Sequence, residues 1–483
     1  MTDSAIVTPV APARPASLRS VFGVILGLAA ANPATVAAQQ PPPAASAAAP
    51  YKLLRYEEDY RNLRDPTARV ELWDPLKYIP LDDRASYLSL GGELRERFEY
   101  YSYPDFGLRG QRPDAYLLHR LLLHADIHLG ENLRGFVQLG NHLAPWKDAA
   151  APPYLDRLNV QQAFVDVRLP FSADVDPVLR MGRQEMVFGS QRLIAVRDAP
   201  SVRRSFDGFR LGDTIGDVRV DAFLTRPVLL RNGVFDDPSN RAQALWGIYA
   251  TAPLGFARGA NIDLYYLGFR NKLARFADGP GDERRHSIGM RLFGAAGGWD
   301  WDLEALGQFG SFGRQDIRAW TVATNSGYSL DILGARVRVG VKADIASGDR
   351  NAQDGKLGTF NAMFPKLAYL SSAALFAPAN LIDVQPTLSI KPMEALTVSF
   401  GYDFLWRATT ADAVYIGAGV PVAGTAGRPG RYTGRSFSVD AVWQVGRHIL
   451  IEAGYVRVDV AKALRAAGGR DVDFTYVAAT YRF

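Results

Sequence analysis

The feature that most constrains this chain is an alternation of apolar and polar side chains with a period of two residues. It recurs in about 18 segments, each near the ten residues that a tilted membrane-spanning strand requires. In the segment 335–345, for example, Val337 and Val339 belong to an apolar face, whereas Arg336 and Lys342 belong to a charged one. Because successive side chains of a strand point to opposite faces, each segment predicts a strand with one face of each kind.

The connections between these segments alternate between short and long. The predicted strands are 88–100, 116–129, 133–142, 160–169, 178–184, 204–212, 217–226, 242–252, 261–270, 285–294, 299–309, 316–324, 335–345, 381–390, 396–407, 435–445, 449–459 and 473–483. Short turns are expected at 130–132, 213–216, 294–298, 391–395 and 446–448. Long loops are expected at 143–158, 185–203, 227–241, 271–284, 346–380, 409–434 and 460–472. Short turns at one end and long loops at the other are typical of outer-membrane barrels.

The strands favour a closed barrel over an open sheet. No later window has eighteen consecutive apolar residues, so no transmembrane helix is predicted. An open sheet in lipid would leave backbone groups unpaired along its edges, which a barrel avoids. We therefore predict an all-β fold, a transmembrane antiparallel barrel of about 18 strands with lipid outside and a charged, water-filled lumen. The region 316–334 fits this pattern least, and the count could differ by two there.

The N-terminus has the features of a secretory signal peptide. Arg14 and Arg19 form a basic region, 21–31 is an apolar core, and small residues precede the expected cleavage after Ala38. The apolar core is too short to anchor the chain in a bilayer. Together with the barrel pattern, the predicted signal peptide indicates a location in the outer membrane of a Gram-negative bacterium.

Four parts of the chain follow from these patterns. Residues 1–38 are the predicted signal peptide, 39–50 a low-complexity linker, 51–86 a short periplasmic segment and 87–483 the barrel. Pro75 and Pro80 exclude a long helix from the periplasmic segment. Whether residues 51–80 plug the periplasmic mouth is left open by the sequence.

Composition and spacing give no support to an enzyme. The chain has no Cys, which removes disulfide scaffolds, thiolate metal sites and Cys nucleophiles. His124, Asp126 and His128 share one strand face, but the two His lie about 13 Å apart on an extended strand, too far for one ion without help from other strands. No Ser is placed beside this pair, and no glycine-rich phosphate loop is present. We therefore expect no catalytic residues, no metal, no cofactor and no nucleic-acid partner.

A basic stretch at 179–210 holds seven arginines. Its middle part, the predicted loop 185–203, is rich in apolar residues, more than a solvated loop needs. We expect this loop to fold into the lumen and to hold its charged residues across the pore, namely Arg197, Asp198, Arg203 and Arg204. The alternation places Arg180 on the lumen face but Arg183 on the lipid face, unless the strand bulges or ends before it.

Charged residues on the predicted lumen faces are candidates for the substrate path. Arginine forms bidentate hydrogen bonds with carboxylates, and rings of Arg and Lys favour anions in pores. A structural alternative is that each forms cross-strand salt bridges that hold the wall. The candidates are Arg95, Arg97, Arg120, Arg168, Arg180, Arg197, Asp198, Arg203, Arg204, Arg336, Arg338, Lys342 and Lys366.

From about Tyr51 to Phe483 the chain resembles the alginate export family of outer-membrane channels. The motifs that carry this resemblance are LSLGGELRERFEYY at 88–101, QAFVDV at 162–167, LRMGRQ at 179–184, RDAPSVRRSFDGFR at 197–210, FNAMFPKLAYLSSAALF at 360–376 and the closing strand that ends in Phe483. The resemblance implies a monomeric 18-stranded barrel with an electropositive lumen, through which an acidic polysaccharide leaves the cell.

Two residues and one turn depart from the pattern of the alginate exporter. Gln161 and Glu185 stand where the resemblance leads us to expect arginines, and the long turn that covers the exporter's pore is reduced to Gly446–His448. The resemblance therefore supports the barrel fold more strongly than it supports alginate as the substrate.

The sequence supports a channel for anionic substrates, with three hypotheses about its use. The first is export of an acidic polysaccharide of the alginate type, for which periplasmic secretion components would be further partners. The second is a porin for uptake of small organic acids. The third, from another class, is a non-conducting structural or adhesion barrel, which a sealed lumen would distinguish. In each case the remaining partner is outer-membrane lipid.

Overall fold

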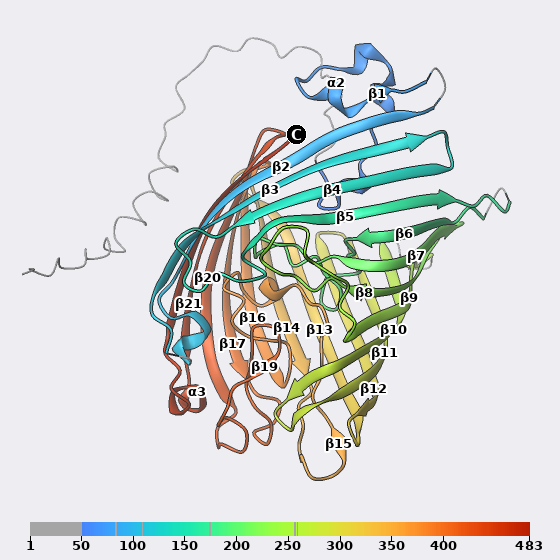
Figure 1. Ribbon diagram of the computed structural model, residues 1–483. Helices are drawn as coiled ribbons and strands as arrows, with labels where there is room; N and C mark the ends of the chain where they lie inside the picture. Colours follow the sequence, from blue (N-terminus) through green and yellow to red (C-terminus); the bar gives the residue numbers. More distant parts are fainter. Residues whose placement is uncertain (1–50, 83–84, 109, 173–174, 256, 258) are drawn as a thin grey trace, which may run out of the picture. The chain divides into compact units, whose positions relative to one another are not determined.

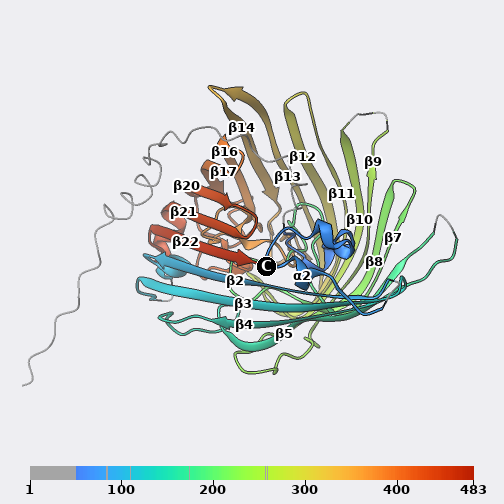
Figure 2. The same ribbon diagram turned by 90° about the horizontal axis from the view of Figure 1, so that it is seen from above.

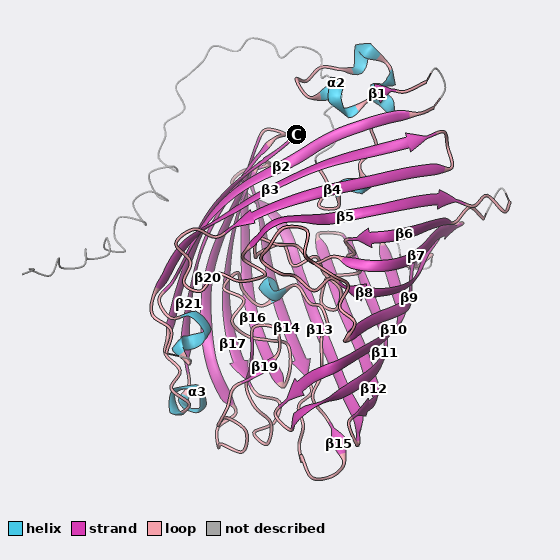
Figure 3. Cartoon of the chain, viewed as in Figure 1, coloured by secondary structure: helices cyan, strands magenta, loops and turns pink. Residues whose placement is uncertain are grey.

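The computed structural model describes residues 51–82, 85–108, 110–172, 175–255, 257 and 259–483. The predicted signal peptide and linker, residues 1–50, lie outside the described residues. Twenty strands belong to one sheet, and eighteen of these form a closed antiparallel barrel, as the alternation predicts (Figures 1 and 3). The sheet closes where β2 pairs with β22, with Glu93 opposite Arg482. No described helix is long and apolar enough to cross a membrane.

The eighteen barrel strands match the predicted segments in number and order. They are β2 (Tyr87–Tyr101), β3 (Asp114–Leu129), β4 (Leu133–Leu143), β5 (Asp156–Arg168), β6 (Val178–Gln184), β7 (Phe206–Ile215), β8 (Val218–Pro227), β9 (Gln243–Pro253), β10 (Ala260–Phe276), β11 (Gly279–Ala296), β12 (Trp299–Phe312), β13 (Gln315–Ile332), β14 (Ala335–Ala346), β16 (Leu381–Met393), β17 (Leu396–Trp406), β20 (Tyr432–Val445), β21 (Ile449–Val460) and β22 (Val472–Arg482).

The remaining elements are short. They are the 3₁₀ turns η1 (Arg55–Glu57), η2 (Arg61–Arg64), η3 (Pro66–Ala68), η4 (Pro104–Gly107) and η5 (Leu367–Tyr369), the helices α2 (Asp74–Lys77) and α3 (Lys462–Ala466), and the two-residue strands β1 (Ile79–Pro80), β15 (Lys356–Leu357), β18 (Tyr415–Ile416) and β19 (Val420–Pro421). As Pro75 and Pro80 predict, the segment before β2 contains no long helix.

One predicted loop is wrong. Residues 271–284 were expected to form a long loop, but β10 continues to Phe276 and β11 begins at Gly279, so that only a tight turn remains. The register shifts between Asn271 and Ala274, and this irregularity interrupts the alternation that would have revealed the longer strands. In the region 316–334, β13 continues into a tight turn before β14, and the count of eighteen holds.

The outside of the barrel is apolar. Large aliphatic and aromatic side chains from successive strands are exposed, which suits contact with lipid acyl chains. Examples are Phe98, Leu123, Val137, Leu224, Ile248, Leu264, Ile288, Leu303, Val322 and Val339. Their neighbours in the alternation point inward and include most of the buried charged residues, so the charged face of each strand lines the interior.

Two long connections lie within the ring of strands when the barrel is viewed along its axis (Figure 2). We name residues 185–205, between β6 and β7, the first lumen loop, and residues 347–380, between β14 and β16, the second lumen loop. The two loops pair through a bridge between Ile194 and Phe364, with the Ala195 amide donating to the Phe364 carbonyl at 3.0 Å. Buried apolar residues of both loops belong to the main hydrophobic core.

Candidate substrate path through the lumen

The lumen contains a central cavity of about 480 Å³. It is bounded by the two lumen loops and by residues of eight strands. These strands are β2, β13, β14, β16, β17, β20, β21 and β22. Five of the predicted basic residues line it, together with the predicted Asp198 and two further acids, Asp440 and Glu452. The basic residues are Arg95, Arg97, Arg338, Lys342 and Lys366.

Most of these basic side chains already have hydrogen-bond partners within the protein. Arg97 donates to Glu99 at 2.6 Å, and its guanidinium lies 3.9 Å from the Tyr476 ring centre. Arg338 bonds both carboxylate oxygens of Asp300. The Lys342 ammonium donates to carbonyl oxygens of the second lumen loop. Lys366 differs, because its side chain is exposed and has no carboxylate partner among the described residues.

Beside Arg338 and Lys342, the wall of the cavity is rich in neutral hydroxyl and amide groups, because Ser389 and Gln385 of β16 are the cross-strand partners of these two residues. Ser389 of β16 and Ser399 of β17 are joined by a hydrogen bond of 2.9 Å. They continue a polar surface that also includes Gln385, Thr387 and Ser438. The charged residues of the sequence do not predict this wall; the alternation of Gln385, Thr387 and Ser389 in β16 was the available signal.

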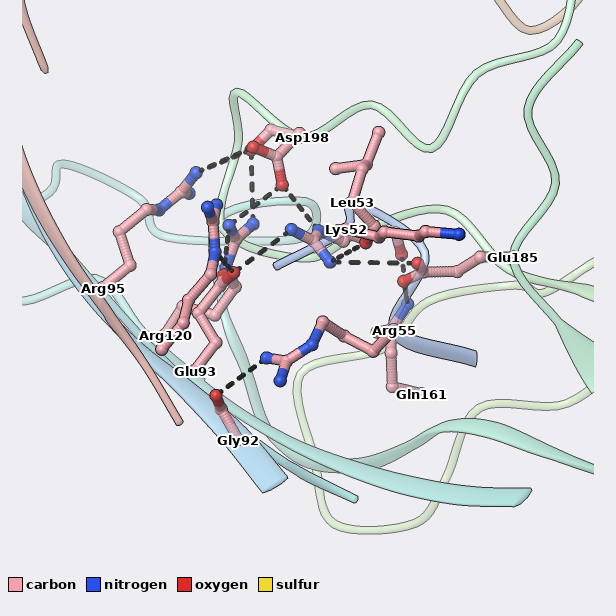
Figure 4. Close-up of polar contacts among 12 residues, drawn as sticks. Lys52, Leu53, Arg55, Gly92, Glu93, Arg95, Arg120, Gln161, Glu185 and Asp198 are labelled. Atoms are coloured by element: carbon pink, nitrogen blue, oxygen red, sulfur yellow. Dashed lines mark hydrogen bonds and ion pairs between the residues drawn. The ribbon is translucent and has the colours of Figure 1, made fainter. Parts of the chain in front are cut away.

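The first lumen loop is fixed to β2 and β3 by a network of ion pairs (Figure 4). Arg120 Nη2 lies 2.8 Å from Glu93 Oε1 and 2.9 Å from Asp198 Oδ1. Arg203 donates to the same Asp198 oxygen at 2.5 Å. Arg95 donates to the carbonyl oxygens of Asp198 and Pro200. As the sequence predicts, the loop enters the lumen, but Arg120 and Arg203 are buried within this network.

Arg197 and Arg204 are in a different situation from Arg203. Arg204 lies 4.9 Å from the centre of the Phe364 ring and contacts the Ala195 carbonyl at 3.4 Å. Among the described residues, the hydrogen bond of the Arg197 side chain is to a backbone carbonyl, that of Val202. Each side chain is partly exposed, and neither has a carboxylate partner in the described part of the chain. These two guanidiniums therefore keep donors that a passing anion could use.

The two positions that depart from the family pattern lie together. Gln161 Nε2 donates to Glu185 Oε1 at 2.9 Å and to Ser205 Oγ at 2.8 Å. Glu185 is fully buried at the start of the first lumen loop, and Arg203 approaches it at 3.9 Å. Burial raises the pKa of Glu185 to about 7, against the opposing effects of Arg203 and of the Gln161 hydrogen bond.

A second opening lies at the end of the barrel that carries the short turns. There a cavity of about 590 Å³ is lined by Tyr56, Arg134, Arg180 and Arg210 among others. Tyr56 is buried and packs edge-on against the stacked rings of Phe136 and Phe164, and the Arg180 guanidinium lies 4.0 Å from the Tyr56 ring centre. Residues 51–56 therefore enter the barrel and narrow this end.

The short turn at 446–448 is a docking site for the N-terminal segment. Tyr51 Oη lies 3.2 Å from His448 Nδ1, and Arg447 bonds Glu71 at 2.5 Å. Trp73 donates to Tyr481 Oη and packs on the Phe483 ring. The chain thus covers the position of the reduced turn with its own N-terminal residues, which the sequence did not predict.

The other predicted path residues lie apart from the central cavity. Arg180 pairs with Asp166 at 2.7 Å beside the second opening. Arg168 is exposed and pairs with Asp176, and Arg336 is exposed and lies 3.8 Å from Asp331 near a tight turn.

Two further sets of residues that the sequence singles out have partners in the structure. Arg183 pairs with Asp207 directly across from it, next to a positive φ of 131° at Gly182. The predicted set of His124, Asp126 and His128 is engaged in other contacts, because Asp126 pairs with Arg134 at 2.7 Å and His124 stacks on Phe136.

Comparison with known proteins gives a family and a fold. The family model described as alginate export matches residues 86–478. A search of curated proteins found no match. Solved structures with the same fold include a BenF-like porin from Pseudomonas fluorescens Pf-5, with a TM-score of 0.56, 10% identity, and coverage of 82% of this chain and 98% of the porin.

Two further porins are similar at the level of the fold. OccAB1 of Acinetobacter baumannii has a TM-score of 0.55 and 11% identity, with 82% of this chain and 96% of OccAB1 covered. OpdQ of Pseudomonas aeruginosa has a TM-score of 0.54 and 12% identity, with 83% and 99% covered. With the match of the family model over most of its length, the chain belongs to the alginate export family of outer-membrane β-barrels.

Proposed function

We propose that this protein is a passive outer-membrane channel that selects anionic substrates in its central cavity. The observation that carries the proposal is the lining of that cavity, in which five basic residues accompany a strip of neutral hydroxyl and amide groups. Lys366 supplies a cationic donor to this cavity without a carboxylate partner among the described residues, and Arg197 and Arg204 of the first lumen loop, which are outside the lining of this cavity, supply two more. Basic groups lower the barrier for anions, and hydroxyls replace part of the hydration shell of a polar substrate.

Charge reversal in planar bilayers tests the selectivity. Lys366→Glu combined with Arg204→Glu should shift the reversal potential in a KCl gradient towards cations, because neither group has a carboxylate partner among the described residues. Arg168→Glu is the matched control, since Arg168 is exposed and lies outside the central cavity. An unchanged selectivity of the double variant would remove these residues from the path.

Arg203 is a poor choice for this experiment, although the sequence places it beside Arg204. It lies within reach of three acids, Glu93, Glu185 and Asp198. Its reversal would therefore disturb the loop before it reports on permeating ions.

For the substrate, family membership supports export of an acidic polysaccharide of the alginate type as the first candidate. The channel would act as a monomer in outer-membrane lipid, with periplasmic secretion components supplying the polymer at the end that carries the short turns. In barrels of this kind the short turns face the periplasm. A chain of uronate residues presents a carboxylate and several hydroxyls per unit, which suits a cavity lined by both cationic and hydroxyl groups.

A specific observation favours a second candidate, the uptake of small organic anions. The lumen loops and the N-terminal segment border cavities of about 480 and 590 Å³, which are on the scale of small-ligand sites.

Liposome swelling distinguishes the two candidates. Rapid swelling with alginate oligomers supports the exporter, whereas swelling only with mono- and dicarboxylates supports the uptake porin. Absence of swelling together with absence of conductance would reject both and leave the non-conducting structural barrel.

A further inference from the structure

The strands β10 to β13 carry basic residues on the outer face of the barrel, at the end opposite the C-terminus (Figure 1). Arg270 of β10 and Arg284 of β11 are direct cross-strand partners. Arg284 and Arg318 of β13 each lie between two buried neighbours in sequence, so their exposed side chains point outward. We name Arg270, Arg284 and Arg318 the outer basic patch. It lies at the end from which the lumen loops leave the strands, and long loops of such barrels face the outside of the cell.

The outer basic patch is only partly neutralised by the protein. Arg270 pairs with Asp282 at 2.9 Å. Neither Arg284 nor Arg318 has a side-chain hydrogen bond or ion pair with any residue that the structure describes. Asp316, on the same face of β13 as Arg318, forms no ion pair with a described residue either. Because like charges directly opposite each other destabilise a strand pair, Arg284 beside Arg270 has a cost that an anion outside the barrel would offset.

The height of the outer basic patch matches the boundary of the membrane. Trp299 of β12 pairs with Tyr328 of β13 near the end with the short turns, and Phe309 pairs with Arg318 near the other end. These two rows are ten residues apart, which corresponds to roughly 25 Å along the axis for strands tilted by about 40°. This is the height of the apolar band of outer-membrane barrels. Arg318 therefore lies at the outer edge of the band, and Arg284 lies beyond it.

Between these rows, the outward-facing residues of β10 to β13 are uncharged. Ile288 and Met290 of β11 are exposed there, as are Trp320 and Val322 of β13. Charges on the lipid face of a barrel cost the least free energy near the interfaces. From there an arginine keeps its methylene groups against lipid while its guanidinium reaches the headgroups. The outer basic patch is thus placed at the level of the headgroups and not of the acyl chains.

We propose that the outer basic patch binds the phosphate groups of lipopolysaccharide, the phosphorylated glycolipid of the outer leaflet. Arginine presents paired donors that match phosphate oxygens. Two strand spacings and two residues of rise place the Cα atoms of Arg284 and Arg318 about 12 Å apart. Two extended side chains can reach neighbouring phosphates of one headgroup over this span. A headgroup with more than one phosphate therefore fits the patch better than a phospholipid with a single phosphate.

The proposed lipid site is independent of the substrate path. None of its three arginines lines the central cavity, because they lie on the outer face of the wall. The bound lipid would offset the repulsion between Arg270 and Arg284 and hold this wall at a fixed height in the membrane. A ligand that binds only the folded state stabilises that state, so lipopolysaccharide should raise the unfolding temperature.

Native mass spectrometry of the protein in detergent tests the proposal. Purified rough-type lipopolysaccharide should bind the wild type saturably, and dephosphorylated lipopolysaccharide should bind at least tenfold more weakly. The double variant Arg284→Gln with Arg318→Gln should lose at least tenfold in affinity for the intact lipid. Arg435→Gln is the matched control and should bind as the wild type does, because Arg435 is exposed near the same end, on β20, but is paired with Asp459.

The unfolding temperature separates lipid binding from a structural role of the arginines. Lipopolysaccharide should raise it by several degrees in the wild type and in Arg435→Gln but not in the double variant, whereas all three should unfold at the same temperature without lipid. Equal binding of lipopolysaccharide by the wild type and the double variant would overturn the proposal. Binding of phosphatidylglycerol as tight as that of lipopolysaccharide would also overturn it, because the patch would then attract any anionic lipid.

Discussion

The first lumen loop is held by charges on one side and by apolar packing on the other. Towards β2 and β3, Arg120 and Arg203 bind Asp198 and Glu93. Towards the second lumen loop, Ile194 is fully buried and its backbone pairs with that of Phe364, which is 5% exposed.

The two sides differ in how they respond to change. A buried charge that loses its partner is strongly unfavourable, whereas apolar contacts weaken in proportion to the area lost. The charged side therefore fixes the position of the loop more strictly, and it alone should respond to pH. The apolar side should tolerate conservative substitutions.

The largest effect on the free energy of unfolding is expected from removing a buried arginine on the charged side of the first lumen loop. Arg203→Met leaves Glu93, Glu185 and Asp198 with one positive charge fewer in a buried site, at a cost of about 3–5 kcal/mol in the free energy of unfolding. Urea titration in detergent micelles, followed by Trp fluorescence, measures this loss.

Arg336→Met is the control for this substitution. Arg336 is exposed near a tight turn, so its loss should change the free energy of unfolding by no more than about 0.5 kcal/mol. Equal effects of the two substitutions would show that the charged side does not hold the loop.

The strands could be predicted from sequence because their alternation is a local property. Each strand carries its own lipid-facing and lumen-facing residues, and closure follows from the need to pair every edge in lipid. The exception at 271–284 has the same cause, since the irregularity between Asn271 and Ala274 removes the local signal while the backbone pairing continues.

The contacts within the lumen could be predicted only in part. The apolar content of residues 185–203 indicated that this loop enters the barrel, and Arg95, Asp198 and Lys366 do meet at the central cavity. The ion pairs could not be predicted, because Glu93 and Arg203 are more than a hundred residues apart and are joined only by the closed fold. For the same reason the entry of Tyr56 into the barrel was not foreseen.

An intermediate effect is expected from the one buried acid of the loop that titrates near neutral pH. The pKa of Glu185, raised from 4.5 to about 7, means that its folded form holds the proton better than its unfolded form. The associated stability is fully present below pH 4.5 and is lost as the pH rises through 7, which corresponds to roughly 3 kcal/mol. Glu185→Gln cannot titrate, so its stability relative to wild type should rise between pH 5 and pH 8.

The same titration should appear in conduction. Ionisation of Glu185 adds a negative charge beside Arg203, so anion preference of the wild type should fall from pH 6 to pH 8 while that of Glu185→Gln stays constant. The reversal potential in a KCl gradient measures this preference. Parallel pH curves for the two proteins would contradict a titration of Glu185 that acts on the permeating ions in this range.

The smallest effect is expected on the apolar side. Ile194→Val removes one methylene group from a fully buried contact with the second lumen loop, at a cost of about 0.5–1.5 kcal/mol. Because no charge changes, the loss should be the same at pH 5 and pH 8, and the reversal potential should not move. Urea titration at both pH values measures it, with Val420→Ala, exposed in β19, as the control for loss of apolar side chain at the surface. A loss that grew with pH would mean that the apolar contact depends on the ion pairs across the loop, and the two sides would then have to be treated as one cooperative unit.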